Sequence, residues 1–190
     1  MGTKQYIMIN KIIAFLLIVL LSPFFLITAF FIYLEDGSPI LFKQRRVGHN
    51  YFFFEIYKFR TMKKGTPNVA THLLNDPEQY LLKLGSILRK FSLDELPNLI
   101  NIIKGEMVFV GPRPALYNQD DLMALRVKAG VDKLKPGITG WAQINGRDEI
   151  SIIEKVKLEV EYLQKKSFFF DIYILFKTFS NVLSIKDVRH

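Results

Sequence analysis

The stretch IIAFLLIVLLSPFFLITAFFIYL (residues 12–34) contains no charged side chain and carries a serine–proline pair at its centre. At about 1.5 Å per helical residue it reaches roughly 35 Å, enough to cross a bilayer core. Pro23 has no N–H and its ring clashes with the preceding turn, while the hydroxyl of Ser22 can satisfy a freed carbonyl. The sequence therefore predicts two helices, each about one leaflet long, joined at a break.

Cationic residues flank this stretch on both sides, with Lys4 and Lys11 before it and three more between residues 43 and 46. Positive charge beside a membrane segment favours the cytoplasmic side. A hairpin that enters and leaves by one face satisfies both flanks, whereas a straight span places one flank on the wrong side. We expect a re-entrant hairpin over residues 1–36; a kinked span is the alternative, because transmembrane helices tolerate proline.

Residues 37–190 are enough for one small domain. Strand-like runs lie within residues 40–62, on either side of a Gly48-His49-Asn50 turn, and helical periodicity follows at 78–89, 95–104, 119–129, 150–166 and 168–185. The last helix has a wide apolar face, which suits either the membrane surface or a core. The expected fold is α+β and mostly helical: a re-entrant helix-break-helix hairpin (1–36), then a cytosolic-face catalytic domain (37–190) with short strands and interfacial helices.

The composition restricts the partners and metals. A net charge of +8 favours anionic partners, and the apolar hairpin points to lipid headgroups or nucleotides, so we expect no nucleic acid. The chain has no cysteine, which excludes disulfides and thiolate metal sites. Its 3 histidines show no ligand spacing and are interpreted as ordinary polar residues. Any metal is therefore expected to bind oxygen ligands.

The segment SLDELPN (residues 92–98) places two adjacent carboxylates before a proline. One interpretation is a capping box with Ser92 at the N-cap and Glu95 at N3. Pro97 would then be the fifth helical residue, where its missing N–H is needed. If the helix begins at Asp94 or later, Pro97 falls in the first turn and both carboxylates lie at the positive end of the helix dipole. An ionised carboxylate there could act as a nucleophile or as a Mg²⁺ ligand.

Three cations are candidates for binding phosphate. Lys58 and Arg60 share one face if their segment is a strand, which suits phosphate oxygens but is also common on basic edge strands. Arg113 lies between Pro112 and Pro114, which fix the backbone on both sides and present the guanidinium rigidly. That geometry favours a bidentate phosphate contact, with a purely structural loop arginine as the alternative.

The segment KPGITGWAQINGR (residues 135–147) combines glycines with polar side chains at alternate positions. The glycines permit close backbone approach to a ligand, and Gln143, Asn145 and Arg147 are candidates for contacting it. Trp141, the only tryptophan, is more typical of a core or interface anchor.

These motifs, in this order after a proline-broken hairpin, resemble the bacterial sugar transferase family of monotopic phosphoglycosyl transferases. The resemblance covers residues 12–181 and rests on KFRTM (58–62), DELP (94–97), GPRP (111–114) and PGITG (136–140). The short N-terminus is similar to that of minimal members, without additional transmembrane helices. The resemblance implies transfer of a sugar phosphate from a UDP-sugar to undecaprenyl phosphate, which gives undecaprenyl diphosphate-sugar and UMP, with Mg²⁺ as cofactor.

The resemblance also implies residue roles. Asp94 would be the nucleophile that forms an aspartyl phosphosugar and Glu95 its partner, with Mg²⁺ held by these two carboxylates. Asp171 falls where the family commonly has a functional aspartate, and the re-entrant break would be Ser22–Pro23. Positive charge around the phosphorus would come from the candidate cations Lys58, Arg60, Arg113 and Arg147.

The resemblance implies a place in the cell as well. The enzyme would work at the inner (cytoplasmic) membrane of a bacterium, with its active site on the cytoplasmic face, in the first membrane step of a glycan or glycoconjugate pathway. This agrees with the cost of removing a polyprenyl tail from the bilayer, about 0.8 kcal/mol per CH₂.

Other classes stay open. A non-catalytic basic membrane anchor or scaffold would release no nucleotide. A membrane phosphatase is a further alternative, and a glycosyltransferase would release UDP instead of UMP. The sequence does not decide which UDP-sugar or pathway is used, or whether the chain forms a homodimer.

Overall fold

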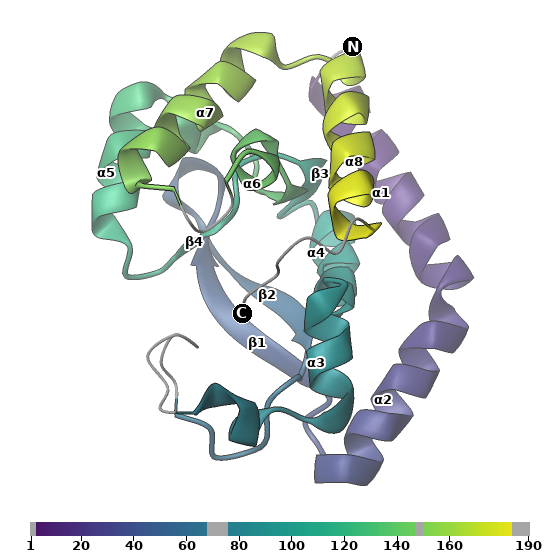
Figure 1. Cartoon of the computed structure of the whole chain (residues 1–190). Helices are drawn as coiled ribbons and strands as arrows, with labels where there is room; N and C mark the ends of the chain where they lie inside the picture. Colours follow the sequence, from purple (N-terminus) through teal and green to yellow (C-terminus); the bar gives the residue numbers. More distant parts are fainter. Residues whose placement is uncertain (1–2, 68–75, 147–149, 184–190) are drawn as a thin grey trace.

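The computed structural model describes residues 3–67, 76–146 and 150–183 (Figure 1). Arg147, one of the four candidate phosphate-binding cations, lies outside the described residues, as do His72 and His190. The fold is α+β and mostly helical, as predicted.

Two helices form the N-terminal hairpin, α1 (Thr3–Leu20) and α2 (Ser22–Asp36), with a bend of 62° between them. Pro23 lies in the first turn of α2, where its missing N–H costs no helical hydrogen bond. The hydroxyl of Ser22 donates to the carbonyl of Val19 at 2.8 Å, which satisfies a group freed by the break. The helix therefore breaks at the predicted pair.

Within the described part of the chain, no helix taken alone has both the length and the apolar composition to cross a membrane, but α1 and α2 taken together have both. Helix α8 (Phe168–Leu183) lies beside α1, and Tyr6 of α1 donates a 2.8 Å hydrogen bond to Asp171 of α8 (Figure 1). One face of α8 is buried at Ile174 and the other is exposed, with Phe169 81% accessible, so α8 is partly a core helix and partly a surface helix.

Exposed apolar side chains gather on these three helices and define what we call the apolar surface. Its members include Met8, Ile12, Phe15, Leu16, Val19 and Leu20 of α1, Leu26, Ile27, Phe30, Phe31 and Leu34 of α2, and Phe168, Phe169, Phe176 and Phe179 of α8. Extensive exposure of large apolar side chains is typical of contact with a membrane or another protein.

The predicted strands form an antiparallel hairpin of β1 (Leu41–Val47) and β2 (Phe53–Phe59), joined by a turn that contains the short 3₁₀ helix η1 (His49–Tyr51). Strand β4 (Ala115–Leu116) pairs antiparallel with the other side of β1, so β2 is an edge strand. A second, parallel pair joins β3 (Val108–Val110) to β5 (Gly137–Thr139).

The remaining helices fall near the predicted segments, apart from two short ones at Val131–Lys133 and Trp141–Ile144 that were not predicted. They are the 3₁₀ helices η3 (Pro77–Tyr80), η4 (Leu93–Asn98) and η5 (Val131–Lys133), and the α-helices α3 (Lys83–Lys90), α4 (Leu99–Lys104), α5 (Asp120–Ala129), α6 (Trp141–Ile144) and α7 (Ile152–Lys165). The capping-box interpretation of Ser92 is wrong: its φ of 54° is left-handed and its side chain makes no cap. The single helix expected at 95–104 is instead η4 followed by α4, because Pro97 falls inside a 3₁₀ segment.

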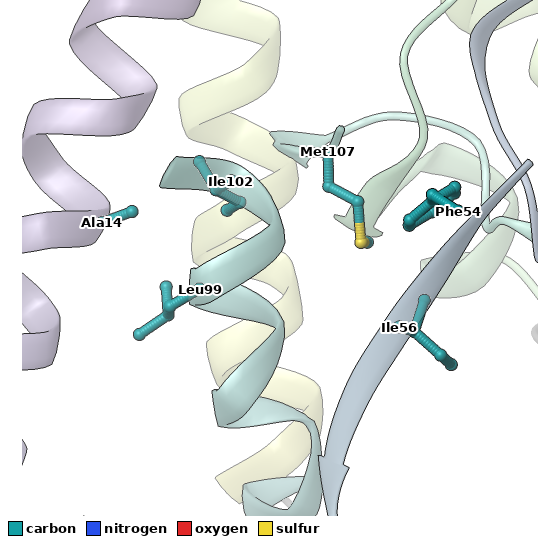
Figure 2. Close-up of a cluster of buried hydrophobic side chains, with 6 residues drawn as sticks. All are labelled: Ala14, Phe54, Ile56, Leu99, Ile102 and Met107. Carbon is teal, nitrogen blue, oxygen red and sulfur yellow. The ribbon is translucent and has the colours of Figure 1, made fainter. Parts of the chain in front are cut away.

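Helix α4 lies between the N-terminal hairpin and the sheet (Figure 2). The buried cluster around it takes Ala14 from α1, Leu99 and Ile102 from α4, and Phe54 and Ile56 from β2, with Met107 beside them. The hairpin thus shares a core with the following domain, and the division at residue 36 stays a prediction about which residues enter the membrane.

Candidate active site

The carboxylate pair Asp94–Glu95, called the dyad below, lies on η4, which packs against the edge strand β2. Ser92 turns the chain between α3 and η4. Asn98 and Asn101 then accept hydrogen bonds from the backbone N–H of Tyr57, at 3.2 and 3.3 Å. These bonds satisfy an amide that has no strand partner on the outer side of β2. The dyad is therefore fixed against the strand that carries Lys58.

Glu95 binds two cations through one oxygen. Its Oε1 lies 2.7 Å from Nζ of Lys58 and 3.2 Å from Nη2 of Arg113, and its side chain is only 12% exposed. Burial raises the pKa of the Glu95 carboxyl, but the charges of Arg113 and Lys58 and the hydrogen bonds they donate outweigh it and hold that pKa well below its usual range. Glu95 is thus a fixed anion that orients two phosphate-binding candidates.

Asp94 is less constrained than its neighbour. Burial is the largest effect and raises the pKa of its carboxyl, and the charge of Glu95 raises it as well. The charges of Lys58 and Arg89 lower this pKa, but the net result is an increase. In the described part of the chain, these side chains act on Asp94 through their charge and not through hydrogen bonds. Its carboxyl does accept a hydrogen bond from its own backbone amide, which lowers the pKa slightly. A carboxylate that no neighbouring cation holds by a hydrogen bond is suited to nucleophilic attack.

A small pocket lies beside Glu95 of the dyad, and Asp94 is not among the residues that line it. Lys58, Glu95, Arg113 and Arg46 supply its charged lining, while the side chains of Ile56, Met107 and Ile138 supply apolar lining. The structure therefore brings together three cations and one carboxylate, an arrangement with a net positive charge that suits a bound diphosphate.

Arg46 is a pocket residue that the motifs do not predict, because in the sequence it is one of the cations that follow the membrane segment. It lies opposite Phe54 in the β1–β2 register, and directly paired residues share a face of the sheet. Since Phe54 is buried, the hairpin register would have placed Arg46 on the inner face. Its Nη1 donates to the carbonyl of Pro114 at 3.1 Å.

Arg60 does not join Lys58 in this pocket. Its guanidinium donates to Oδ2 of Asp36 at 2.5 Å and to the carbonyl of Gly37 at 2.6 Å, at the end of α2. The residue is 7% exposed. A cation beside the negative end of a helix dipole is favourable, so this geometry gives Arg60 the role of holding the hairpin to the sheet.

The polar residues of the fourth motif make local hydrogen bonds. Gln143 donates to the carbonyl of Ile138 at 3.0 Å, and Asn145 donates to the carbonyl of Trp141 at 2.8 Å. The Oε1 of Gln143 is buried and has no hydrogen-bond partner among the described residues. The ring of Trp141 packs on Phe170, as expected of a core anchor.

The glycines of this motif allow a close approach, but to another loop. A Cβ on Gly140 would lie 2.1 Å from the carbonyl oxygen of Gly111, and one on Gly137 would lie 2.1 Å from the amide nitrogen of Gly111. The motifs around Arg113 and Gly137 therefore pack backbone against backbone, in continuation of the β3–β5 pairing. Gly137 also lines the pocket beside Glu95, and the expectation that the glycines make room for a ligand stays a prediction.

Asp171 lies in a different part of the structure from the residues that line the pocket. It is 5% exposed and accepts hydrogen bonds from the hydroxyls of Tyr6 and Tyr162, each at 2.8 Å. These contacts join α1, α7 and α8. Asp171 thus links three helices through hydrogen bonds, and its functional role stays a prediction.

Carboxylate oxygens for a divalent cation are few at this site. In residues 3–67, 76–146 and 150–183, no cluster of three or more His, Asp or Glu side chains could hold a metal ion. Magnesium is commonly bound by one or two carboxylates while substrate phosphates and waters complete its shell. The dyad fits that pattern and does not fit a metal held by protein ligands alone.

The chain is similar to known proteins over most of its length. The sequence profile described as bacterial sugar transferase matches residues 4–185. The uncharacterized sugar transferase EpsL of Bacillus subtilis is 44% identical over 168 residues, which cover 88% of this chain and 82% of that protein. The exopolysaccharide production protein ExoY of Sinorhizobium fredii is 37% identical over 184 residues, which cover 89% and 81% of the two chains.

A longer relative carries the same region. The UDP-glucose:undecaprenyl-phosphate glucose-1-phosphate transferase of Escherichia coli is 39% identical over 176 residues, which cover 88% of this chain and 38% of that protein. The profile and the relatives extend over nearly the whole length described here, from the hairpin to α8. The chain belongs to the bacterial sugar transferase family.

Proposed function

We propose that this enzyme transfers a sugar 1-phosphate from a UDP-sugar to undecaprenyl phosphate and releases UMP. The observation that carries the proposal is the unequal dyad, in which Glu95 is fixed by Lys58 and Arg113 while Lys58 and Arg89 act on Asp94 through their charge alone. The names of the relatives from E. coli and from Aeromonas hydrophila, an N-acetylgalactosaminephosphotransferase acting on undecaprenyl phosphate, support the same reaction class.

In the proposed first step, Asp94 is the nucleophile. An Oδ atom of Asp94 attacks the phosphorus that carries the sugar, and the bond from that phosphorus to the bridging oxygen breaks. UMP leaves with the electron pair of that bond, and an aspartyl phosphosugar remains. Lys58 and Arg113 lie beside the dyad and stabilise the negative charge that develops on the phosphate oxygens.

The second step reverses the roles. An oxygen of undecaprenyl phosphate attacks the same phosphorus, the bond to Asp94 breaks, and the carboxylate is regenerated. One cationic pocket thus serves two bulky anions in turn, so donor and acceptor need not be held together. Mg²⁺, held by the Asp94 and Glu95 carboxylates with donor phosphate oxygens, would supply further charge neutralisation.

The apolar surface supports a place for this reaction at the membrane. It covers the outer faces of α1, α2 and α8, and the 62° bend between the first two helices suits a segment that enters and leaves by one face. We propose that the bent pair is re-entrant at the inner membrane of a bacterium and that the dyad works on the cytoplasmic face. There the polyprenyl tail of the acceptor stays in the bilayer.

The nucleotide product tests the proposal. Purified enzyme in nanodiscs that contain undecaprenyl phosphate is given a panel of UDP-sugars with Mg²⁺, and UMP and UDP are separated chromatographically. UMP release with at least one donor, lost in Asp94→Asn, is the expected result. Release of UDP would indicate a glycosyltransferase, and no nucleotide from any donor would favour the anchor or scaffold.

A further inference from the structure

The loop that presents Arg113 is held through three consecutive carbonyl groups. Each accepts a hydrogen bond from a different element: the carbonyl of Pro112 from the amide of Gly137 at 2.9 Å, that of Arg113 from Nη2 of Arg126 at 2.9 Å, and that of Pro114 from Nη1 of Arg46 at 3.1 Å. Because two of these three residues are prolines without an N–H, carbonyl bonds are the main means of fixing this backbone.

The donor to the central carbonyl is part of a buried ion pair. Arg126 on α5 is 4% exposed and Glu159 on α7 is 2% exposed. Nε of Arg126 donates to Oε2 of Glu159 at 2.8 Å, and its Nη2 donates both to Oε1 of Glu159 and to the carbonyl of Arg113. The carboxylate of Glu159 thus fixes the plane of the Arg126 guanidinium, and in that plane one N–H points at the carbonyl of Arg113.

Stability alone is a weak reason for such a pair. Burying two charges costs several kcal/mol, and replacing a buried ion pair by apolar side chains of similar volume is often neutral or stabilising. The neighbouring side chains of α5 and α7 already pack through Leu122, Met123 and Val156. A planar guanidinium, however, can bind a carboxylate by its fork and still donate to a third group, which a lysine or an apolar residue cannot do.

We propose that Arg126, oriented by Glu159, is a positioning residue for catalysis: it fixes the backbone of Arg113 so that the Arg113 guanidinium reaches Glu95 and the donor phosphate. This inference rests on the proposed function, in which Arg113 binds the donor. Arg126 itself does not line the dyad pocket. Its effect on the reaction therefore passes through the loop.

The main test replaces both charges at once with Arg126→Met and Glu159→Leu. The apparent Tm is expected to stay within about 3 °C of wild type, because no unpaired charge remains. The kcat for UMP release is expected to fall by about tenfold to a hundredfold, with a smaller change in KM, because a displaced Arg113 guanidinium loses contacts to the transition state. Wild-type kcat in the double variant would overturn the proposal.

Two controls separate positioning from packing. Val156→Ala loosens the same α5–α7 contact without touching the charges, so it is expected to lower the apparent Tm and leave kcat unchanged. In an Arg113→Ala background, the double replacement is expected to change the remaining rate by less than about twofold, since its effect acts through Arg113. The inference would be contradicted if Val156→Ala lost as much kcat as the double variant. It would also be contradicted if the losses were additive in the Arg113→Ala background.

Hydrogen exchange gives a readout that needs no turnover. In the double variant the amides of Gly111 and Gly137, which donate to the carbonyls of Thr139 and Pro112, are expected to exchange at least tenfold faster than in wild type, while amides of β1 keep their rates. Unchanged exchange at both amides would refute the positioning role even if the enzyme used another substrate. Absence of UMP from the wild-type enzyme would refute only the proposed function.

Discussion

Replacing Glu95 by glutamine tests whether the fixed carboxylate organises the site. The substitution keeps the size of the side chain but leaves Lys58 and Arg113, 17% and 28% exposed, without their counter-charge. Removing one partner of a buried pair costs about 3 to 5 kcal/mol, and partial hydration of the two cations reduces that cost. We therefore expect a loss of about 2 to 3 kcal/mol in the free energy of unfolding, or roughly 5 to 10 °C in apparent Tm.

The dependence on pH sharpens this prediction. Burial acts to raise the pKa of Glu95, but Arg113 and Lys58 hold it well below its usual range, so the stabilisation by the pair is fully present above the unfolded-state pKa of about 4.3. It is lost as the pH falls through the folded-state pKa. The difference in Tm between wild type and Glu95→Gln should therefore be constant from about pH 7 to pH 5 and shrink in more acidic buffer.

The assay is thermal unfolding of both proteins in one detergent across that pH range. Lys165→Gln is a matched control, because Lys165 is 57% exposed and its i,i+4 pair with Glu161 lies in solvent, where such pairs contribute little to stability. If Glu95→Gln changes the Tm no more than this control does, or if the difference persists unchanged in acid, the fixed anion at the centre of the site is refuted.

Three further predictions concern Arg113, the nucleophile Asp94 and the N-terminal hairpin. Arg113→Lys should lower kcat/KM by about 2 kcal/mol or more, because an ammonium cannot make a bidentate phosphate contact; wild-type turnover would leave Arg113 a structural residue. Burial raises the pKa of Asp94 and the charge of Arg89 lowers it. Arg89→Met should therefore move the acid limb of the kcat/KM profile to higher pH, and a shift to lower pH would contradict the assignment of Asp94 as the nucleophile. A cysteine at residue 3 should react with reagents only from the cytoplasmic side, and Ser22→Ala with Pro23→Ala should straighten the hairpin and move that cysteine outward; periplasmic labelling of the first protein would refute the re-entrant topology.

Local chemistry explains which features the sequence could predict. The break at Pro23 and the rigid loop around Arg113 both follow from the proline ring, which acts within a few residues. The β1–β2 pair follows from alternating side chains around a short turn. The family followed from the order of the motifs, and comparison with known proteins confirmed it.

Contacts between distant residues explain what the sequence could not predict. Asn98 and Asn101 fix η4 against Tyr57, more than 40 residues earlier in the chain. Arg60 was grouped with Lys58 by spacing, but the carboxylate of Asp36 at the end of α2 binds it instead. No local pattern pairs an arginine with a carboxylate that only the folded chain brings near, and the same holds for Arg126 and Glu159.

Single-turnover release of UMP tests the covalent role of Asp94 most directly. Enzyme in nanodiscs without undecaprenyl phosphate is mixed with an excess of UDP-sugar and Mg²⁺, and UMP is measured over time. We expect a burst of up to about one UMP per enzyme, a sugar phosphate attached to the peptide that contains Asp94, and no burst from Asp94→Asn. Steady-state kinetics with both substrates should then give parallel double-reciprocal lines. Two results would contradict the aspartyl intermediate and leave Asp94 at most a metal ligand. One is intersecting lines with no UMP release before lipid is added, and the other is an active Asp94→Asn enzyme.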